Sequence, residues 1–447
     1  MNRTTRLATP TSVSTEMAII GGVPLKGEIT VQGAKNSVSK CMVAAMLTAE
    51  PCTLKNVPNI DDVHVVREMI RALGGTVEEV RPGVICITAT SIKEIAPTTL
   101  KSIAGRSRIP ILFAGPMLAR FGHTMVPELG GCNIGPRPVD FHLSALEQLG
   151  ATIEHVPKGF IMRTSRLVGN RIHLPYPSVG ATEQILLAAT LAEGITVISN
   201  AAVEPEIIDL IALLQKMGAI ISVDTDRTVT IIGVQALHGY DHTVMPDRLE
   251  AASWACAAIA TDGRITVRNA RQLDMTTFLN KYQQIGGAFE IHDDGITFSR
   301  GRELTSIAVE TDVHPGFMTD WQQPFVVALT QAHGASVVHE TVYENRFGFT
   351  DALKRMGADI QLYRECLGGK QCRFGQKSHL HSAIIMGPTS LIGARIAIPD
   401  LRAGFSYIVA ALTARGETTI AHMEIIGRGY ERFSEKLRAL GATIVRG

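Results

Sequence analysis

Six basic side chains in this sequence lie in turns rich in glycine and proline, where a rigid backbone can aim them at one ligand. They are Lys35 in QGAKNS, Arg108 in SRIP, Arg137 in GGCNIGPRPVD, Arg346 in ENRFGF, Arg402 in PDLRAG and Arg428 in GRGYE. Arginine matches the geometry of carboxylate and phosphate groups, so several converging arginines predict a site for a small polyanion. Any one of them could instead be a solvated surface charge. The prediction therefore depends on the whole set.

Cys132 is the residue whose setting most favours catalytic chemistry. It lies in LGGCNIGPR, residues 129–137, five positions before Arg137. A nearby cation and exposed backbone amides favour the thiolate, which can act as a nucleophile or, when protonated, as a proton donor. The alternative is a small buried cysteine, which fits a glycine-rich turn less well.

The other cysteines predict no metal site and no disulfide framework. The seven cysteines of the chain are Cys41, Cys52, Cys86, Cys132, Cys256, Cys366 and Cys372, and they form no CxxC pair. An odd count without a secretion signal favours reduced thiols in the cytoplasm. Five residues separate Cys366 from Cys372, and we expect no partner histidine there, which argues against a zinc site.

The elements that must position these turns can be predicted from a sequence pattern, here called a phrase, that occurs six times. It reads aliphatic-x-x-aliphatic-Gly-small-x-aliphatic-polar, and its first glycines are Gly74, Gly150, Gly218, Gly286, Gly357 and Gly441. Each copy predicts an amphipathic helix that ends at a glycine and is followed at once by a strand. Units of about 70 residues are longer than ordinary solenoid repeats and favour a pseudo-symmetric globular arrangement.

A second phrase precedes the first in most units: an alanine-rich apolar helix, a polar turn and a β-branched strand. Its clearest copies are Leu186–Ala201, Cys256–Ala270, Val327–Thr341 and Ala410–His422. Two helices and several strands per unit predict an α/β chain of two domains, with three units each and a ligand cleft between them. The sequence has neither a P-loop nor a GxGxxG motif after a strand, which argues against those nucleotide-binding folds.

Composition excludes several classes of partner. The chain of 447 residues has 43 Lys plus Arg against 42 Asp plus Glu, so we expect no attraction to nucleic acid or to an anionic membrane. The longest apolar stretches, such as Ile109–Ala119, are too short to span a bilayer. The polar residues 1–17 lack a signal-peptide core and predict a flexible tail.

Nine segments, in order over nearly the whole chain, resemble one known family. They are LKGEITVQGAKNS, LGGCNIGPRPVDFH, PSVGATE, NAAVEPEI, PDRLEAASW, HPGFMTDWQQP, ETVYENRFGF, PDLRAG and RGYERFSEKLRALGA. Together they are similar to the UDP-N-acetylglucosamine 1-carboxyvinyltransferase (MurA) family of the enolpyruvyl transferase (EPSP synthase-like) superfamily. No single segment would suffice, but nine in register are specific.

The resemblance implies a fold and domain boundaries. The family fold is two inside-out α/β barrels, each made of three copies of one unit, with the active site in the cleft between them. We therefore expect one domain over residues 35–244. The other would join residues 18–34 to 245–447, because the strand region Ile19–Val31 is expected to complete it.

The resemblance also implies a reaction. Members transfer the enolpyruvyl group of phosphoenolpyruvate to the 3′-hydroxyl of UDP-N-acetylglucosamine by addition and elimination, and release phosphate. This is the first committed step of peptidoglycan synthesis in the cytoplasm. It needs no cofactor and no metal, so the expected partners are the two small-molecule substrates, with the oligomeric state left open.

Site residues follow from the resemblance position by position. Cys132 is the implied proton donor and would confer fosfomycin sensitivity, and Asp320 is the implied base. The implied anion clamp comprises Lys35, Arg137, Arg346, Arg402 and Arg428. The implied contacts to the UDP-sugar are Asn36, Arg108, the run Arg137, Pro138, Val139, Asp140 and Phe141, then Tyr176, Ser178, Val179, Asp320 and Val342.

Three departures keep alternatives open. Gly427 stands where many members carry an acidic or amide residue, and Tyr176 stands where others carry a lysine. The segment Tyr363–Gln376 lengthens the last unit, which supplies Arg402. The first alternative is a related transferase that acts on another uridine nucleotide such as UMP. The second is a catalytically silent paralogue that binds UDP-sugars, which the intact Cys132 argues against.

Overall fold

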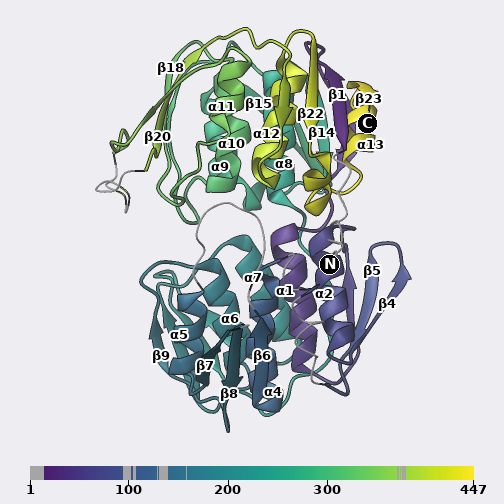
Figure 1. Ribbon diagram of the computed structural model, residues 1–447, viewed down its shortest axis with the longest axis vertical. Helices are drawn as coiled ribbons and strands as arrows, with labels where there is room; N and C mark the ends of the chain where they lie inside the picture. Colours follow the sequence, from purple (N-terminus) through teal and green to yellow (C-terminus); the bar gives the residue numbers. More distant parts are fainter. Residues whose placement is uncertain are drawn as a thin grey trace, which may run out of the picture.

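The protein consists of two lobes stacked along its long axis (Figure 1). The computed structural model describes residues 15–93, 102–103, 107–127, 129, 139–157, 159–369, 372, 374 and 379–446. Within these residues the strands form six separate sheets, five of four strands and one of three. Each sheet belongs to a unit with two helices, so the six copies of the phrase correspond to six α/β units.

The lower lobe in Figure 1 holds three of these units. The first has α1 (Lys35–Ala44), α2 (Asp61–Ala72) and the sheet β13 (Asp241–Thr243), β3 (Cys52–Lys55), β5 (Val84–Thr88), β4 (Thr76–Arg81). The second has α4 (Ala114–Phe121), α5 (Asp140–Gln148) and the sheet β6 (His123–Pro127), β8 (Gly159–Arg163), β7 (Thr152–Val156). The third has α6 (Val179–Ala189), α7 (Pro205–Lys216) and the sheet β11 (Ile220–Val223), β12 (Val229–Ile232), β10 (Ile195–Ser199), β9 (Arg171–His173).

The upper lobe repeats the pattern. Its first unit has α8 (Arg248–Ala260), α9 (Thr276–Gln284) and the sheet β15 (Gly287–His292), β16 (Gly295–Arg300), β14 (Arg264–Arg268), β2 (Lys26–Thr30). Its second has α10 (Thr319–Leu329), α11 (Thr350–Arg355) and the sheet β17 (Ala308–Glu310), β18 (Gly334–His339), β20 (Ser382–Gly387), β19 (Asp359–Tyr363). Its third has α12 (Leu401–Thr413), α13 (Phe433–Ala439) and the sheet β21 (Arg395–Ala397), β22 (Glu417–Ala421), β1 (Glu16–Ile20), β23 (Thr443–Arg446). Short 3₁₀ helices cover Ala45–Leu47, Ile109–Phe113, Gln272–Asp274 and Met423–Arg428.

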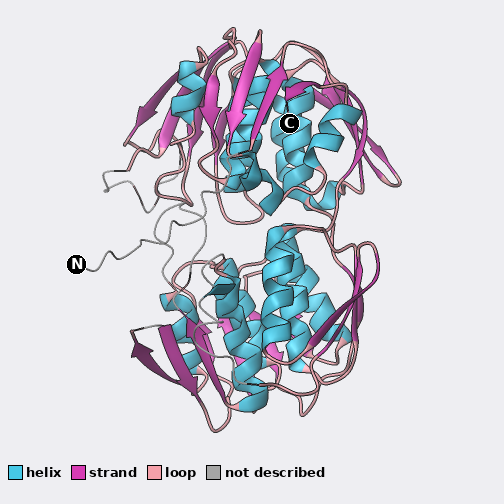
Figure 2. Ribbon diagram, turned by 45° about the vertical axis from the view of Figure 1, so that its right-hand side comes forward, coloured by secondary structure: helices cyan, strands magenta, loops and turns pink. Residues whose placement is uncertain are grey.

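Helices fill the centre of each lobe and strands lie on the outside (Figure 2). The central helices α1, α4, α6, α8, α10 and α12 come from the alanine-rich phrases, and every residue of α8 is buried. Small residues let such helices pack closely on all sides. No described helix is both long and apolar enough to cross a membrane. This arrangement matches the inside-out barrels that the family resemblance implies.

A glycine in the left-handed region follows the cap of each outer helix. The φ angles are +95° at Gly74, +96° at Gly150, +98° at Gly218, +112° at Gly286, +100° at Gly357 and +83° at Gly441. After α7, the N–H of Gly218 donates to the carbonyl of Gln215 and that of Ala219 to the carbonyl of Leu214. These are the two bonds of a Schellman motif. The predicted role of the repeated glycine is confirmed.

The first two strands of the chain lie in sheets of the upper lobe. β1 is antiparallel to both β22 and β23, and β2 is parallel to β14. One apolar cluster accordingly joins Met17–Val31 to Leu249–Leu440, while the other extends from Val38 to Val244. β1 begins at Glu16, inside the segment expected as a tail, and residues 1–14 lie outside the described part.

The extra segment Tyr363–Gln376 differs from expectation in two respects. It joins β19 to β20, so it belongs to the unit of α10 and α11 and not to the unit of α12, the helix that carries Arg402. It also brings Cys366 to a histidine, because Cys366 Sγ lies 3.4 Å from Nε2 of His381, just before β20. The expectation that this cysteine has no partner histidine is therefore wrong.

The glycine caps generate a stability prediction. A Cβ at Gly441 would meet no atom within 4 Å, so Gly441→Ala changes only the cost of a positive φ. We expect a loss of about 1–2 kcal/mol, seen as a lower Tm in thermal unfolding followed by circular dichroism. Gly348→Ala is the matched control, because its Cβ is equally unobstructed and its φ is not in the positive range. Equal Tm values for the two variants would contradict the account.

Candidate active site

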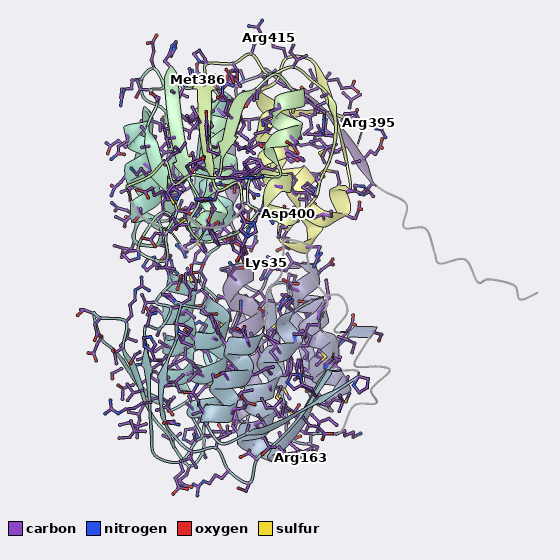
Figure 3. The ribbon with its side chains drawn as sticks, turned by 60° about the vertical axis from the view of Figure 1, so that its left-hand side comes forward. Lys35, Arg163, Met386, Arg395, Asp400 and Arg415 are labelled. Carbon is purple, nitrogen blue, oxygen red and sulfur yellow. The ribbon has the colours of Figure 1, made fainter. Side chains whose placement is uncertain are left out.

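A cleft of about 590 Å³ lies between the lobes and takes its lining from both. Lys35 and Arg108 come from the lower lobe, while Asp320, Arg402 and Arg428 come from the upper lobe. Figure 3 shows Lys35 at the top of the lower lobe, opposite Asp400 at the base of the upper one. Basic residues far apart in the sequence thus line one cleft, as expected from the turns that carry them.

Five of the six central helices present their N-terminal ends to this cleft. Cleft residues include Lys35 at the start of α1, Val179 at the start of α6 and Arg248 at the start of α8. Thr319 at the start of α10 and Arg402 near the start of α12 also line the cleft. Backbone N–H groups at a helix start carry partial positive charge and favour anions. Helix ends and cationic side chains therefore add to the same positive potential.

On the lower side, Lys35 forms an ion pair with Asp62 in the first turn of α2. Burial acts to raise the pKa of Asp62, but the charges of Lys35 and Arg428 outweigh it and hold that pKa below its usual range. The backbone N–H of Lys35 donates to Asp247 Oδ2 at 3.2 Å, which links the lobes. Lys35 is thereby held at the cleft by contacts from both lobes.

On the upper side, two guanidinium groups hold the carboxylate of Asp320. Arg346 Nη2 donates to Oδ1 at 2.6 Å, and Arg402 Nε lies 3.2 Å from Oδ2. Arg402 Nη1 also donates to the hydroxyl of Tyr430 at 2.9 Å. Burial raises the pKa of Tyr430 to about 12 against the opposing charge of Arg402, so the phenol stays neutral. Arg346 is absent from the cleft surface and acts on it through Asp320.

Glu340 organises the segment that carries Val342. Its carboxylate accepts from the N–H groups of Val342 at 2.8 Å and Tyr343 at 2.9 Å, and from the Thr319 hydroxyl at 2.9 Å. Glu340 is fully buried. The contact with Thr319 fixes this turn to the start of α10, one residue before Asp320, so both reach the cleft as a unit.

The remaining predicted contacts lie at the lower-lobe wall. Ser178 caps α6, its hydroxyl accepting from the Ala181 N–H at 3.3 Å. The predicted residues that the structure places in the cleft are Lys35, Asn36, Arg108, Val139, Asp140, Phe141, Tyr176, Ser178, Val179, Asp320, Val342, Arg402 and Arg428. Cys132, Arg137 and Pro138 lie outside the described residues. Their roles remain predictions.

Several charged residues of the cleft could not be identified from the sequence. Arg248 makes two 3.0 Å bonds to Glu206, and Lys40 lies 3.4 Å from Glu183. Burial raises the pKa of Glu183 to about 7, although the charge of Lys40 opposes this shift. Arg248 lies at the start of α8, whereas Lys40 and Glu183 lie within α1 and α6, and charged residues in helices are mostly exposed to solvent. Their pairing across units was not visible in the sequence.

The sequence model of EPSP synthase (3-phosphoshikimate 1-carboxyvinyltransferase) matches residues 19–437. The chain belongs to this family of enolpyruvyl transferases. It is 52% identical over 443 residues to UDP-N-acetylglucosamine 1-carboxyvinyltransferase of Protochlamydia amoebophila, covering 96% of this chain and 93% of the relative. It is 46% identical over 432 residues to the protein of the same name from Chlamydia pneumoniae, covering 95% and 94%.

Solved structures support the same fold. The enolpyruvyl transferase NikO from Streptomyces tendae aligns with a TM-score of 0.83 at 22% identity, covering 96% of this chain and 98% of NikO. EPSP synthase from Acinetobacter baumannii aligns with a TM-score of 0.74 at 19% identity, covering 97% and 100%. The two-lobed arrangement with six repeated units is therefore that of the enolpyruvyl transferases.

The buried Glu183 predicts a pH effect on stability. Because its folded pKa of about 7 exceeds the unfolded value of 4.5, its contribution is full below that unfolded value and is lost as pH rises through 7. Glu183→Gln lacks this loss, so its stability relative to wild type should rise by about 3 kcal/mol between acidic and mildly alkaline buffer. Tm differences measured across that range check the prediction, with exposed Glu193→Gln as control. A difference independent of pH would refute it.

Proposed function

We propose that this enzyme transfers the enolpyruvyl group of phosphoenolpyruvate to the 3′-hydroxyl of UDP-N-acetylglucosamine and releases phosphate. The observation that carries the proposal is one cleft lined by Lys35, Arg402 and Arg428 from two lobes, suited to a small substrate with a carboxylate and a phosphate. The acceptor follows from relatives of that name that are 46–52% identical over nearly the whole chain. The reaction would open peptidoglycan synthesis in the cytoplasm.

The chemistry sets the requirements for the site. A proton adds to C3 of phosphoenolpyruvate while the sugar oxygen bonds to C2 and loses its own proton. Elimination then breaks the C2–O bond to phosphate and removes a proton from C3, which restores the double bond. A proton donor, a base and cations that follow the phosphate are needed, and we assign no metal or cofactor to these steps.

We assign these roles to residues of the cleft. Asp320 is the base for the 3′-hydroxyl, and Lys35, Arg402 and Arg428 hold the phosphate and carboxylate. Arg346 orients Asp320, since its Nη2 donates to one carboxylate oxygen. Cys132 is assigned as the donor to C3 on sequence resemblance. Asn36, Tyr176 and Val342, with the other lower-wall residues, are assigned to the UDP-sugar.

The ion pairs of the cleft explain how substrate binding could free the catalytic base. Arg402 now contacts Asp320, and Lys35 contacts Asp62. An incoming phosphoenolpyruvate would compete with these carboxylates for the cations, which would release Asp320 to accept a proton. The cations thus pass from internal carboxylates to the substrate, and closure of the lobes would exclude water during the exchange.

Phosphate release tests the assignment of substrate. Purified protein is incubated with phosphoenolpyruvate and either UDP-N-acetylglucosamine or UMP, without added divalent metal. We expect release with the UDP-sugar alone. Release with UMP alone would retain the anion clamp but refute the acceptor. Silence with both, from folded protein that still binds UDP-sugar, would refute the enzymatic proposal in favour of a silent binding protein.

Truncation of Arg402 tests the clamp. Arg402→Ala should lower kcat about a hundredfold or more, because one preorganised donor to a developing charge contributes about 3 kcal/mol. Arg395→Ala is the control, since Arg395 is exposed on β21 and pairs with Glu16. Tm and UDP-sugar affinity of both variants exclude a folding defect. Near wild-type kcat in folded Arg402→Ala would remove Arg402 from the mechanism.

A further inference from the structure

Four potential metal ligands meet in the upper lobe, apart from the cleft. They are His339 at the end of β18, Cys366 after β19, Cys372 beyond it and His381 just before β20, and their ligand atoms all lie within 4.8 Å of one another. His339 and His381 are fully buried. Two thiols and two imidazoles are a ligand set typical of zinc.

Two of the distances between these ligand atoms fit one tetrahedral ion. Zn–S bonds of about 2.3 Å and Zn–N bonds of about 2.0 Å at tetrahedral angles place two sulfurs about 3.8 Å apart, and sulfur and nitrogen about 3.5 Å apart. The two Sγ atoms lie 3.6 Å apart, and Cys366 Sγ lies 3.4 Å from His381 Nε2. A disulfide requires about 2.05 Å between the sulfurs. The spacing therefore fits shared coordination, not a covalent bond.

The contacts of the two histidines leave Nε2 of each ring for coordination. Nδ1 of His339 lies 3.0 Å from Glu310 Oε2, and Nδ1 of His381 lies 3.0 Å from the carbonyl of His379. A proton on each Nδ1 satisfies these acceptors and leaves the Nε2 lone pair for a metal. Metal-bound histidines commonly show this second contact. Among the described residues, buried His339 Nε2 has no hydrogen-bond partner.

The surrounding loop is shaped to close over these ligands. Glu310 Oε1 accepts from the N–H of Gly369 at 2.8 Å, so one carboxylate holds both the loop and His339. A Cβ at Gly368 would lie 2.3 Å from Glu310 Oε2 and 2.4 Å from His339 Nδ1, so a larger residue there would displace the carboxylate or the imidazole. Ser382 Oγ accepts from the N–H of Leu367 at 3.2 Å. These contacts fix Cys366 above the ends of β18 and β20.

A second cluster of three groups in the lower lobe lacks these features. Cys41, Asp209 and His242 lie together, but Asp209 already accepts from the Ser37 hydroxyl at 2.6 Å and contacts His242 Nε2 at 3.1 Å. Its members satisfy one another, so it does not call for a metal.

We propose that His339, Cys366, Cys372 and His381 bind one structural Zn²⁺ ion. Four protein ligands complete a tetrahedral shell and leave no position for substrate, so the ion stabilises structure instead of catalysing a reaction. It would fasten the extended β19–β20 connection to the end of β18. Glu340 directly follows the ligand His339, and its carboxylate holds the turn that carries Val342. The ion would therefore also support this wall of the cleft.

Metal analysis tests the proposal on the full-length protein. Wild type, purified with reductant from zinc-containing medium, should carry about one Zn²⁺ per chain by mass spectrometry, and Cys366→Ser less than about a tenth of that. Cys86→Ser, a half-buried cysteine on β5 of the lower lobe, is the matched control and should keep its zinc. Chelator should lower the Tm of wild type, and Zn²⁺ but not Mg²⁺ should restore it.

Cobalt replacement keeps the test decisive if Cys366→Ser fails to fold. Wild type stripped of metal and given Co²⁺ should show the visible bands of a tetrahedral ion with thiolate ligands. Three results would overturn the proposal: wild type without zinc that takes up no Co²⁺, equal zinc in Cys366→Ser, or a Cys366–Cys372 disulfide in reductant-treated protein.

Discussion

The structure depends on the positive charge gathered where the central helices begin. Their alanine-rich sequences let them pack in the middle of each lobe, and their starts meet at one cleft together with Lys35, Arg402 and Arg428. Partial charges of helix ends and full charges of side chains cannot share so small a volume unopposed. Asp62 and Asp320 supply the opposing charge. The cleft therefore favours anions, and the carboxylates of Asp62 and Asp320 balance its positive charge.

Much of this could be predicted because it is local. A glycine that ends a helix is decided by residues within one turn, so Gly74 and Gly441 were identifiable as helix ends from their phrases alone. The alanine-rich segments predicted the buried helices for the same local reason, because their composition leaves no polar face. Lys35, Asn36 and Arg402 could be assigned to the cleft because rigid turns and a family resemblance mark their positions.

The rest depends on pairings between distant segments. Asp62 resembles an ordinary residue of a helix start until the fold places it against Lys35. His339 ends β18 and Cys366 follows β19, and the pairing of both strands with β20 brings them together. Register, not composition, decides which side chains meet across a sheet. No pattern along the chain reports that register over such separations.

The place of β1 has a consequence for how the chain is made. It lies between β22 and β23, so the first described strand bridges two strands from the last part of the chain. During synthesis the lower lobe has all its residues long before this sheet can form, and β1 must stay unpaired until β22 and β23 have been made. An unpaired strand invites wrong partners meanwhile. The upper lobe is therefore closed by pairing one strand made before the lower lobe with two strands made after it.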